Sequence, residues 1–165
     1  MNIIVRLLLI AALTLPFAAC KKEAEAKKET ATAALPAPTN EDAAAWRAYV
    51  TDVVGRNMDG VTNAPFVYLL PPESSADFEG SYQRLLDKAK SDVSRGILAG
   101  NLLAYASASP SSTKTADMVV AAFESVKPDK LKGVKLLFIG KAVDKDRVQA
   151  AVAPSGVRYV FVETN

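Results

Sequence analysis

From residue 40 onward, short uninterrupted apolar runs alternate with longer segments in which apolar residues recur at helical spacing. The uninterrupted runs are bounded by proline, glycine or polar residues, a pattern typical of strands buried on both faces. They cover 66–70, 102–106, 134–139 and 157–162. Between them, three segments carry apolar residues three or four positions apart, which indicates helices with one buried face. These segments begin near Ser74 or Ser75, near Thr113 and near Asp144.

One more helical segment precedes the first run. Asn40 can cap it, Trp46 lies on its apolar face, and it ends near Asp59-Gly60. The element order is therefore a helix, three strand–helix units and a last strand. This alternation predicts right-handed crossovers and a small, mainly parallel four-stranded sheet in a three-layer α/β domain. We expect a doubly wound sheet of strand order 2-1-3-4, with the N-terminal helix covering a face or an edge.

The first 20 residues follow a different pattern. A short basic start ending at Arg6 is followed by the apolar run Leu7 to Leu15, and then by Pro16 and small residues before Cys20. A basic start, a short apolar run and small residues before a cut site are typical of a secretory signal. The run is too short to cross a bilayer, which needs about 20 apolar residues. We therefore expect residues 1–19 to be a removable signal peptide.

The sequence Ala18-Ala19-Cys20 resembles the lipobox of bacterial lipoproteins, although Phe17 stands where that family usually has leucine or another aliphatic residue. The resemblance covers residues 1–20 only. It implies that Cys20 is acylated with fatty acids such as palmitate, that the chain is cut before Cys20, and that membrane lipid is a partner. Because Lys21 is not aspartate, the resemblance favours the outer membrane, facing the periplasm. The alternative is cleavage by the ordinary signal peptidase near Ala19, which would leave a soluble periplasmic protein.

Residues 20–39 are rich in Lys, Glu, Ala and Pro, and Leu35 is their only large apolar residue. Such a segment cannot bury enough surface to offset its conformational entropy. We therefore expect a disordered tether between the anchor and an α/β domain spanning 40–165. A docking segment for the cell wall or a partner is the alternative for this stretch.

The composition excludes several kinds of site. The chain has no histidine and a single cysteine, which removes the commonest general base, internal disulfides and the usual zinc or copper ligands. From Asn40 onward there are 15 basic and 15 acidic residues, and a neutral domain argues against nucleic-acid binding. We expect no metal and no cofactor.

Candidate ligand-binding residues lie in the loops that follow the predicted strands, because open parallel sheets bind ligands beyond the carboxyl ends of their strands. The candidates are Ser75, Ser109, Ser111, Ser112, Lys114, Lys141 and Asp144. The hydroxyl-rich loop before the third helical segment could hold an anion, but helix capping explains the same residues. Ser111 and Lys114 match a Ser-x-x-Lys pattern, without the Lys-Thr-Gly and Ser-Asp-Asn motifs that accompany it in penicillin-recognising enzymes.

These observations together predict a lipid-anchored envelope protein whose domain has a non-catalytic binding or accessory role. The expected partners are membrane lipid, through Cys20, and an envelope protein. Two alternatives stay open, both using the strand-end loops. One is binding of a small molecule or anion, and the other is a small periplasmic hydrolase that uses serine, lysine or carboxylate side chains.

Overall fold

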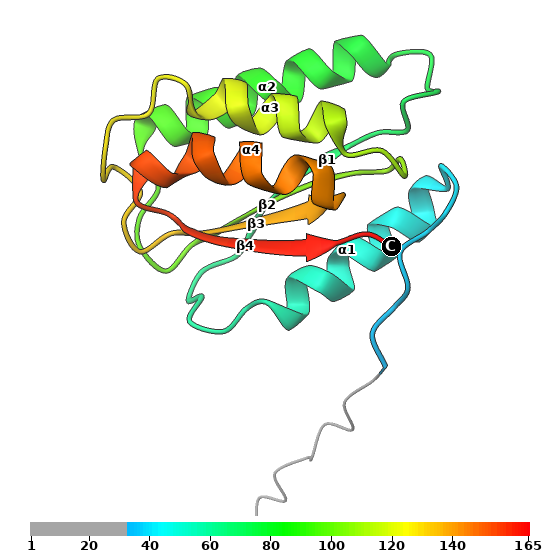
Figure 1. Ribbon diagram of the computed structural model, residues 1–165, viewed down its shortest axis with the longest axis horizontal. Helices are drawn as coiled ribbons and strands as arrows, with labels where there is room; N and C mark the ends of the chain where they lie inside the picture. Colours follow the sequence, from blue (N-terminus) through cyan, green and yellow to red (C-terminus); the bar gives the residue numbers. More distant parts are fainter. Residues whose placement is uncertain (1–32) are drawn as a thin grey trace, which may run out of the picture. The chain divides into compact units, whose positions relative to one another are not determined.

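The computed structural model describes residues 33–165 as four helices and four strands (Figure 1). In chain order, the elements are α1 (Ala43–Arg56), β1 (Phe66–Leu70), α2 (Phe78–Arg95), β2 (Leu102–Ser107), α3 (Thr113–Phe123), β3 (Lys135–Gly140), α4 (Ala142–Val152), the short 3-10 helix Ala153–Ser155, and β4 (Arg158–Glu163). This order confirms the predicted α/β class. The signal peptide, Cys20 and most of the predicted tether lie outside the described residues.

The four strands form one parallel sheet, as the element order predicted, but the strand order is β1-β2-β3-β4. The predicted order 2-1-3-4 is therefore wrong, and the sheet is not doubly wound. Each crossover moves one strand further in the same direction, so crossovers of one hand place their helices on one face. Figure 1 shows α2, α3 and α4 on one face and α1 on the other. Because the strand order never reverses, the sheet has no switch-point crevice of the kind that binds ligands in doubly wound folds.

Two apolar clusters lie against the two faces of the sheet. The larger joins the sheet to α2, α3 and α4, and the smaller joins it to α1. Strands β2 and β3 are buried along their whole length, which explains their uninterrupted apolar runs. Trp46 of α1 is 2% exposed, and its indole nitrogen donates to the carbonyl of Asn40 at 2.7 Å. The predicted apolar face of the first helix is therefore its sheet-facing side.

Helix α1 runs antiparallel to the strands (Figure 1), so its first turn lies near their carboxyl ends and its last turn near their amino ends. At its C-terminal end, the ammonium group of the buried Lys135 donates to the carbonyls of Asn57 at 2.8 Å and Asp59 at 2.5 Å. A cation here satisfies carbonyls that have no helical partner. Lys135 is the first residue of β3, so this end of α1 lies at the amino edge of the sheet.

Three helix starts differ in detail from the prediction. Asp42, not Asn40, caps α1, and its carboxylate accepts from the amides of Ala44 and Ala45 at 2.9 and 3.0 Å. Helix α2 begins at Phe78, after a turn in which Ser75 uses only backbone groups. Asp144 is in the first turn of α4 rather than at its cap. In each case the helix begins a few residues from the expected position, because a sequence pattern locates the first residue of a helix only approximately.

Candidate functional site

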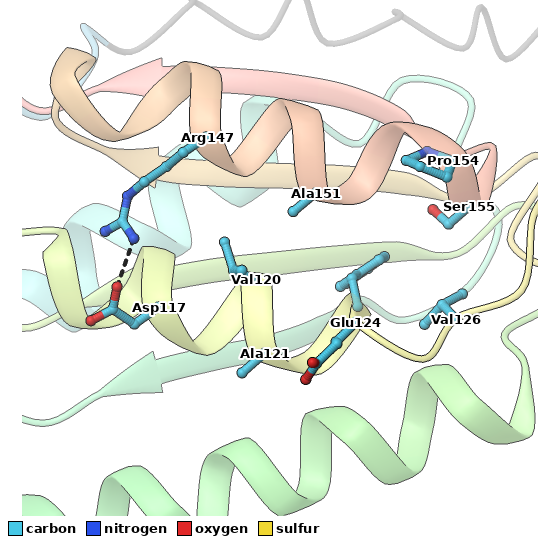
Figure 2. Close-up of a pocket in the computed structure, with 10 residues that line it drawn as sticks. Asp117, Val120, Ala121, Glu124, Val126, Arg147, Ala151, Pro154 and Ser155 are labelled. Atoms are coloured by element: carbon cyan, nitrogen blue, oxygen red, sulfur yellow. Dashed lines mark hydrogen bonds and ion pairs between the residues drawn. The ribbon is translucent and has the colours of Figure 1, made fainter.

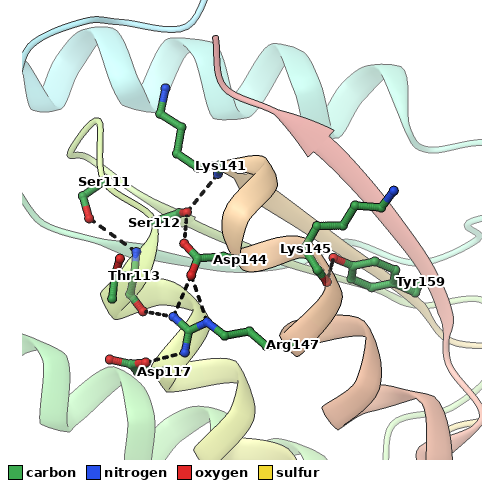
Figure 3. A network of polar contacts seen from close by, with 9 residues as sticks. All are labelled: Ser111, Ser112, Thr113, Asp117, Lys141, Asp144, Lys145, Arg147 and Tyr159. Carbon is green, nitrogen blue, oxygen red and sulfur yellow. Dashed lines mark hydrogen bonds and ion pairs between the residues drawn. The ribbon is translucent and has the colours of Figure 1, made fainter.

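The carboxyl edge of the sheet brings together three of the predicted residues, Ser112, Lys141 and Asp144 (Figure 3). The Ser112 hydroxyl donates to the Asp144 carboxylate at 2.5 Å and accepts from the backbone amide of Lys141 at 2.8 Å. Ser112 and Asp144 are 3% and 4% exposed. This hydroxyl is therefore buried, donates its only proton to Asp144 and already accepts one hydrogen bond, so it is not presented to a ligand.

Arg147 completes this cluster from α4. Its guanidinium lies 2.8 Å from Asp144 and 2.6 Å from Asp117 of α3, and it also donates to the carbonyl of Thr113 at 3.0 Å. Burial lowers the pKa of Arg147, but the hydrogen bonds to Asp117 and Asp144 outweigh it and raise the pKa overall. The cluster clamps the first turns of α3 and α4 together, which explains its polar residues by a structural role.

Gly140, the last residue of β3, allows Ser112 at the start of α3 to lie close to the strand. A methyl group at its Cβ position would lie 2.6 Å from the Cβ of Ser112 and 2.9 Å from its hydroxyl oxygen. Such distances are far inside van der Waals contact, so a side chain here would displace Ser112. The glycine that ends β3 therefore lets the start of α3 pack directly against the strand.

A second polar cluster lies at the start of α1. Ser109 donates to the Glu41 carboxylate, which also accepts from the backbone amides of Glu73 at 3.1 Å and Ser74 at 3.2 Å. The side-chain hydrogen bond from Ser109, followed by those from Ser74 and Glu73, lowers the pKa of Glu41. Sequence reasoning missed Glu41 because it assigned this residue to a helix turn. No periodic signal links position 41 to loops that follow β1 and β2.

The side chains of Ser75, Ser111, Lys114 and Lys141 do not join these two clusters. The exposed Ser111 accepts from the amide of Thr113 at 3.4 Å, whereas the Lys114 ammonium lies over the Tyr82 ring, 5.8 Å from its centre. The Lys141 ammonium donates to the carbonyl of Thr164 at 2.5 Å, and Ser75 belongs to the turn before α2. The Ser-x-x-Lys pair is therefore not joined by a hydrogen bond in the part of the chain that the structure describes.

A groove of about 490 Å³ lies between α3 and α4 on their outer side (Figure 2). Its charged lining residues are Asp117, Glu124 and Arg147. Asp117 and Arg147 are paired with each other at 2.6 Å. The groove thus follows the junction of two helices, and its one cation is already used in the clamp.

A second groove, of about 430 Å³, lies at the carboxyl end of β1. We call it the β1-edge groove. Its apolar lining residues include Leu69, Pro71, Pro72 and Leu85, and its charged ones are Arg47, Arg84 and Lys88. Of residues 33–165, no acidic one lines this groove. It is the candidate binding site, because it combines apolar walls with charged side chains of one sign in one concave site.

One charged cluster lies beside this groove, on α2. Asp92 is 7% exposed and accepts from Lys88 at 2.6 Å, Arg95 at 2.7 Å and the Tyr68 hydroxyl at 2.8 Å. Burial raises the pKa of Asp92, but the bonds from Lys88, Tyr68 and Arg95 together outweigh it, so the pKa is lowered. Burial, followed by the bond to Asp92, raises the pKa of Tyr68.

These carboxylates predict how stability depends on pH. A carboxylate whose pKa is lowered by folding stabilises the native state fully above its unfolded pKa, and this contribution is lost as the pH falls through its folded pKa. Because the chain has no histidine, we expect the free energy of unfolding to change little between about pH 5.5 and 8. It should then fall below about pH 4 as Glu41 and Asp92 gain protons. Urea unfolding followed by circular dichroism between pH 3 and 8 measures this.

Asp92→Asn provides the control for that pH dependence. It should lower the free energy of unfolding at pH 7 by about 1–2 kcal/mol, because it removes charge-assisted hydrogen bonds. It should also flatten the decline below pH 4, since one titrating group is gone. A wild-type protein that became more stable on acidification would contradict the assignment.

Within residues 33–165, no helix is both long and apolar enough to span a bilayer, and no acidic residues or other ligands cluster in a way that suits a metal ion. Comparison of the chain with protein-family models, with curated proteins and with solved structures gave no match.

Proposed function

We propose that this protein is a lipid-anchored envelope protein whose α/β domain binds a partner protein without chemical turnover. The carrying observation is the contrast between the two parts of the carboxyl edge. The predicted hydroxyls of Ser109 and Ser112 bind carboxylates there, whereas the neighbouring β1-edge groove presents cations and apolar walls to solvent. The signal layout ending at Cys20 supports the anchor.

The buried serines are poorly placed to act as nucleophiles. Ser109 and Ser112 are each 3% exposed, and each donates its proton to a carboxylate. A serine nucleophile must reach its substrate, and hydroxyl groups buried to this extent are not presented to one. These hydroxyls instead join loops to one another, which favours a binding role for the edge that they hold in place.

The chain before α1 packs along that helix and does not line the β1-edge groove. The amide of Leu35 donates to Asp52, ten residues into α1, at 3.2 Å, and Ala37 packs on the smaller apolar cluster. Residues 35–40 therefore lie along α1 and run antiparallel to it. None of residues 33–40 lines the β1-edge groove, so this segment leaves the groove open to a partner.

Crosslinking in living cells tests the proposal. A photoreactive amino acid is placed at Ala76, which is exposed in the loop after β1. The control position is Leu98, which is 80% exposed between α2 and β2, at the amino ends of the strands. We expect a discrete crosslinked envelope protein from position 76 and none from position 98. If neither position yields a discrete product under conditions in which the protein is anchored, the proposed binding role is wrong.

A further inference from the structure

The β1-edge groove is lined by side chains from both faces of the sheet. It is lined by Arg47 of α1 and by Arg84 and Lys88 of α2, and these helices lie on opposite faces of the sheet (Figure 1). Side chains from opposite faces line one groove where it passes around an outer strand or over the ends of the strands. Because β1 is an outer strand and Leu69 to Pro72 line the groove, the groove lies against the carboxyl end of β1.

The main chain of β1 has hydrogen-bonding groups directed away from β2. The carbonyl of Leu70 accepts from the amide of Ala108 at 2.8 Å, so the main chain of Leu70 points toward β2. Successive residues of a strand present their main-chain groups to alternate sides. Val67 and Leu69 therefore direct their amides and carbonyls to the open side, and Val67 is 44% exposed. An outer strand of this kind is a template for one more strand.

The positive charge of the groove favours an added strand that carries acidic side chains. Arg84 pairs with Asp77 at 2.6 Å and Lys88 pairs with Asp92 at 2.6 Å, and both cations stay more than half exposed. Among residues 33–165, the exposed Arg47 side chain has no ion-pair or hydrogen-bond partner. A second copy of β1 would bring the same three cations against these, so the charge disfavours pairing of this edge with itself.

We propose that the β1-edge groove binds an acidic, extended segment of a partner protein, which adds to β1 as an outer strand. Its main chain pairs with Val67 and Leu69, its carboxylates meet Arg47 and Arg84, and its apolar side chains contact Leu69 and Leu85. Pro65 and Pro71 bound β1, so pairing is limited to a short segment. This assignment rests on the proposed binding role and names its site and ligand class.

Selection from a random decapeptide library displayed on phage tests the assignment on the anchored, full chain held in detergent. We expect enriched peptides to carry carboxylates at alternate positions between β-branched or aromatic residues. Their affinity, measured by fluorescence anisotropy, should fall about tenfold or more in Arg47→Glu. The control Arg158→Glu makes the same charge change on an exposed residue of β4, at the opposite edge of the sheet, and should leave the affinity unchanged.

A second pair of variants tests strand addition separately from charge. Val67→Pro removes an amide that the sheet does not use, and proline is tolerated at such outer positions, whereas Val67→Thr keeps the amide. Binding should be lost in Val67→Pro and retained in Val67→Thr, while both keep the circular dichroism spectrum of the wild type. If Val67→Pro does not fold, the comparison of Arg47→Glu with Arg158→Glu still decides the assignment.

Three results would overturn this inference. One is enrichment of peptides no more acidic than the starting library. Another is equal binding to Arg47→Glu and wild type, which would place peptide binding elsewhere. The third is complete displacement of the peptide by millimolar succinate, which would make the groove a site for small anions. None of them affects the crosslinking test from position 76. The proposed site for an acidic strand can therefore be rejected while the proposed binding of a partner protein is retained.

Discussion

Substitution of Asp144 by alanine is expected to lower the free energy of unfolding by about 3 kcal/mol. The change leaves the buried Ser112 hydroxyl without its acceptor, at a cost of about 1–3 kcal/mol, and removes an ion pair with Arg147 at 2.8 Å. Arg147 keeps Asp117 at 2.6 Å and is 38% exposed, so its charge stays partly solvated and the loss is below that for a fully buried pair. Chemical denaturation at pH 7 measures the difference.

The matched control is Asp146→Ala, which removes the same group from an exposed position of α4 and should change stability by less than about 0.5 kcal/mol. Gly140→Ala should disturb the same hydrogen bond between Ser112 and Asp144, because the added methyl group would displace Ser112. It should destabilise the domain by about 2–3 kcal/mol. Equal stability of Asp144→Ala and Asp146→Ala would show that the clamp contributes little.

Replacement of Cys20 by alanine is expected to abolish attachment of fatty acid and to move the mature protein from the membrane fraction to the soluble fraction. The physical reason is that two or more acyl chains hold a protein stably at a bilayer, whereas residues 33–165 contribute no spanning helix. Metabolic labelling with a radioactive fatty acid, followed by fractionation, measures both effects. Lys21→Ala is the control, since it keeps Cys20 and should keep the label.

Two outcomes would contradict the lipid anchor. Wild-type protein that takes up no label would do so, as would a Cys20→Ala protein that stays labelled. Wild type found unlabelled in the soluble fraction would instead support ordinary signal-peptide cleavage near Ala19.

Much of the domain was predictable from local pattern. Apolar runs at 66–70 and 134–139 correspond to β1 and β3, and the spacing around Trp46 and Phe78 corresponds to the buried faces of α1 and α2. These features follow from which side chains each element must bury, and periodicity records that directly. The parallel sheet also followed, because strands separated by helices require crossover connections.

The candidate site was predictable only in part. Ser112, Lys141 and Asp144 were selected as strand-end residues and do lie together, but as parts of a clamp. Arg147 and Glu41 were not selected. Asp117, one partner of Arg147, lies 30 positions away in the chain, and Ser109, one partner of Glu41, lies 68 positions away. Arg47 and Arg84 line one groove only because α1 and α2 flank β1 at an open edge.

The order of strands and helices, their parallel pairing, the lack of histidine chemistry and the predicted anchor at Cys20 all follow from the amino-acid sequence. The pairing of the strands in chain order, with β1 and β4 as the outer strands, becomes known only from the folded domain. The reason is that apolar periodicity states which face of an element is buried but not which element covers it. Strand order, and with it the place of the β1-edge groove, depends on pairing between distant segments.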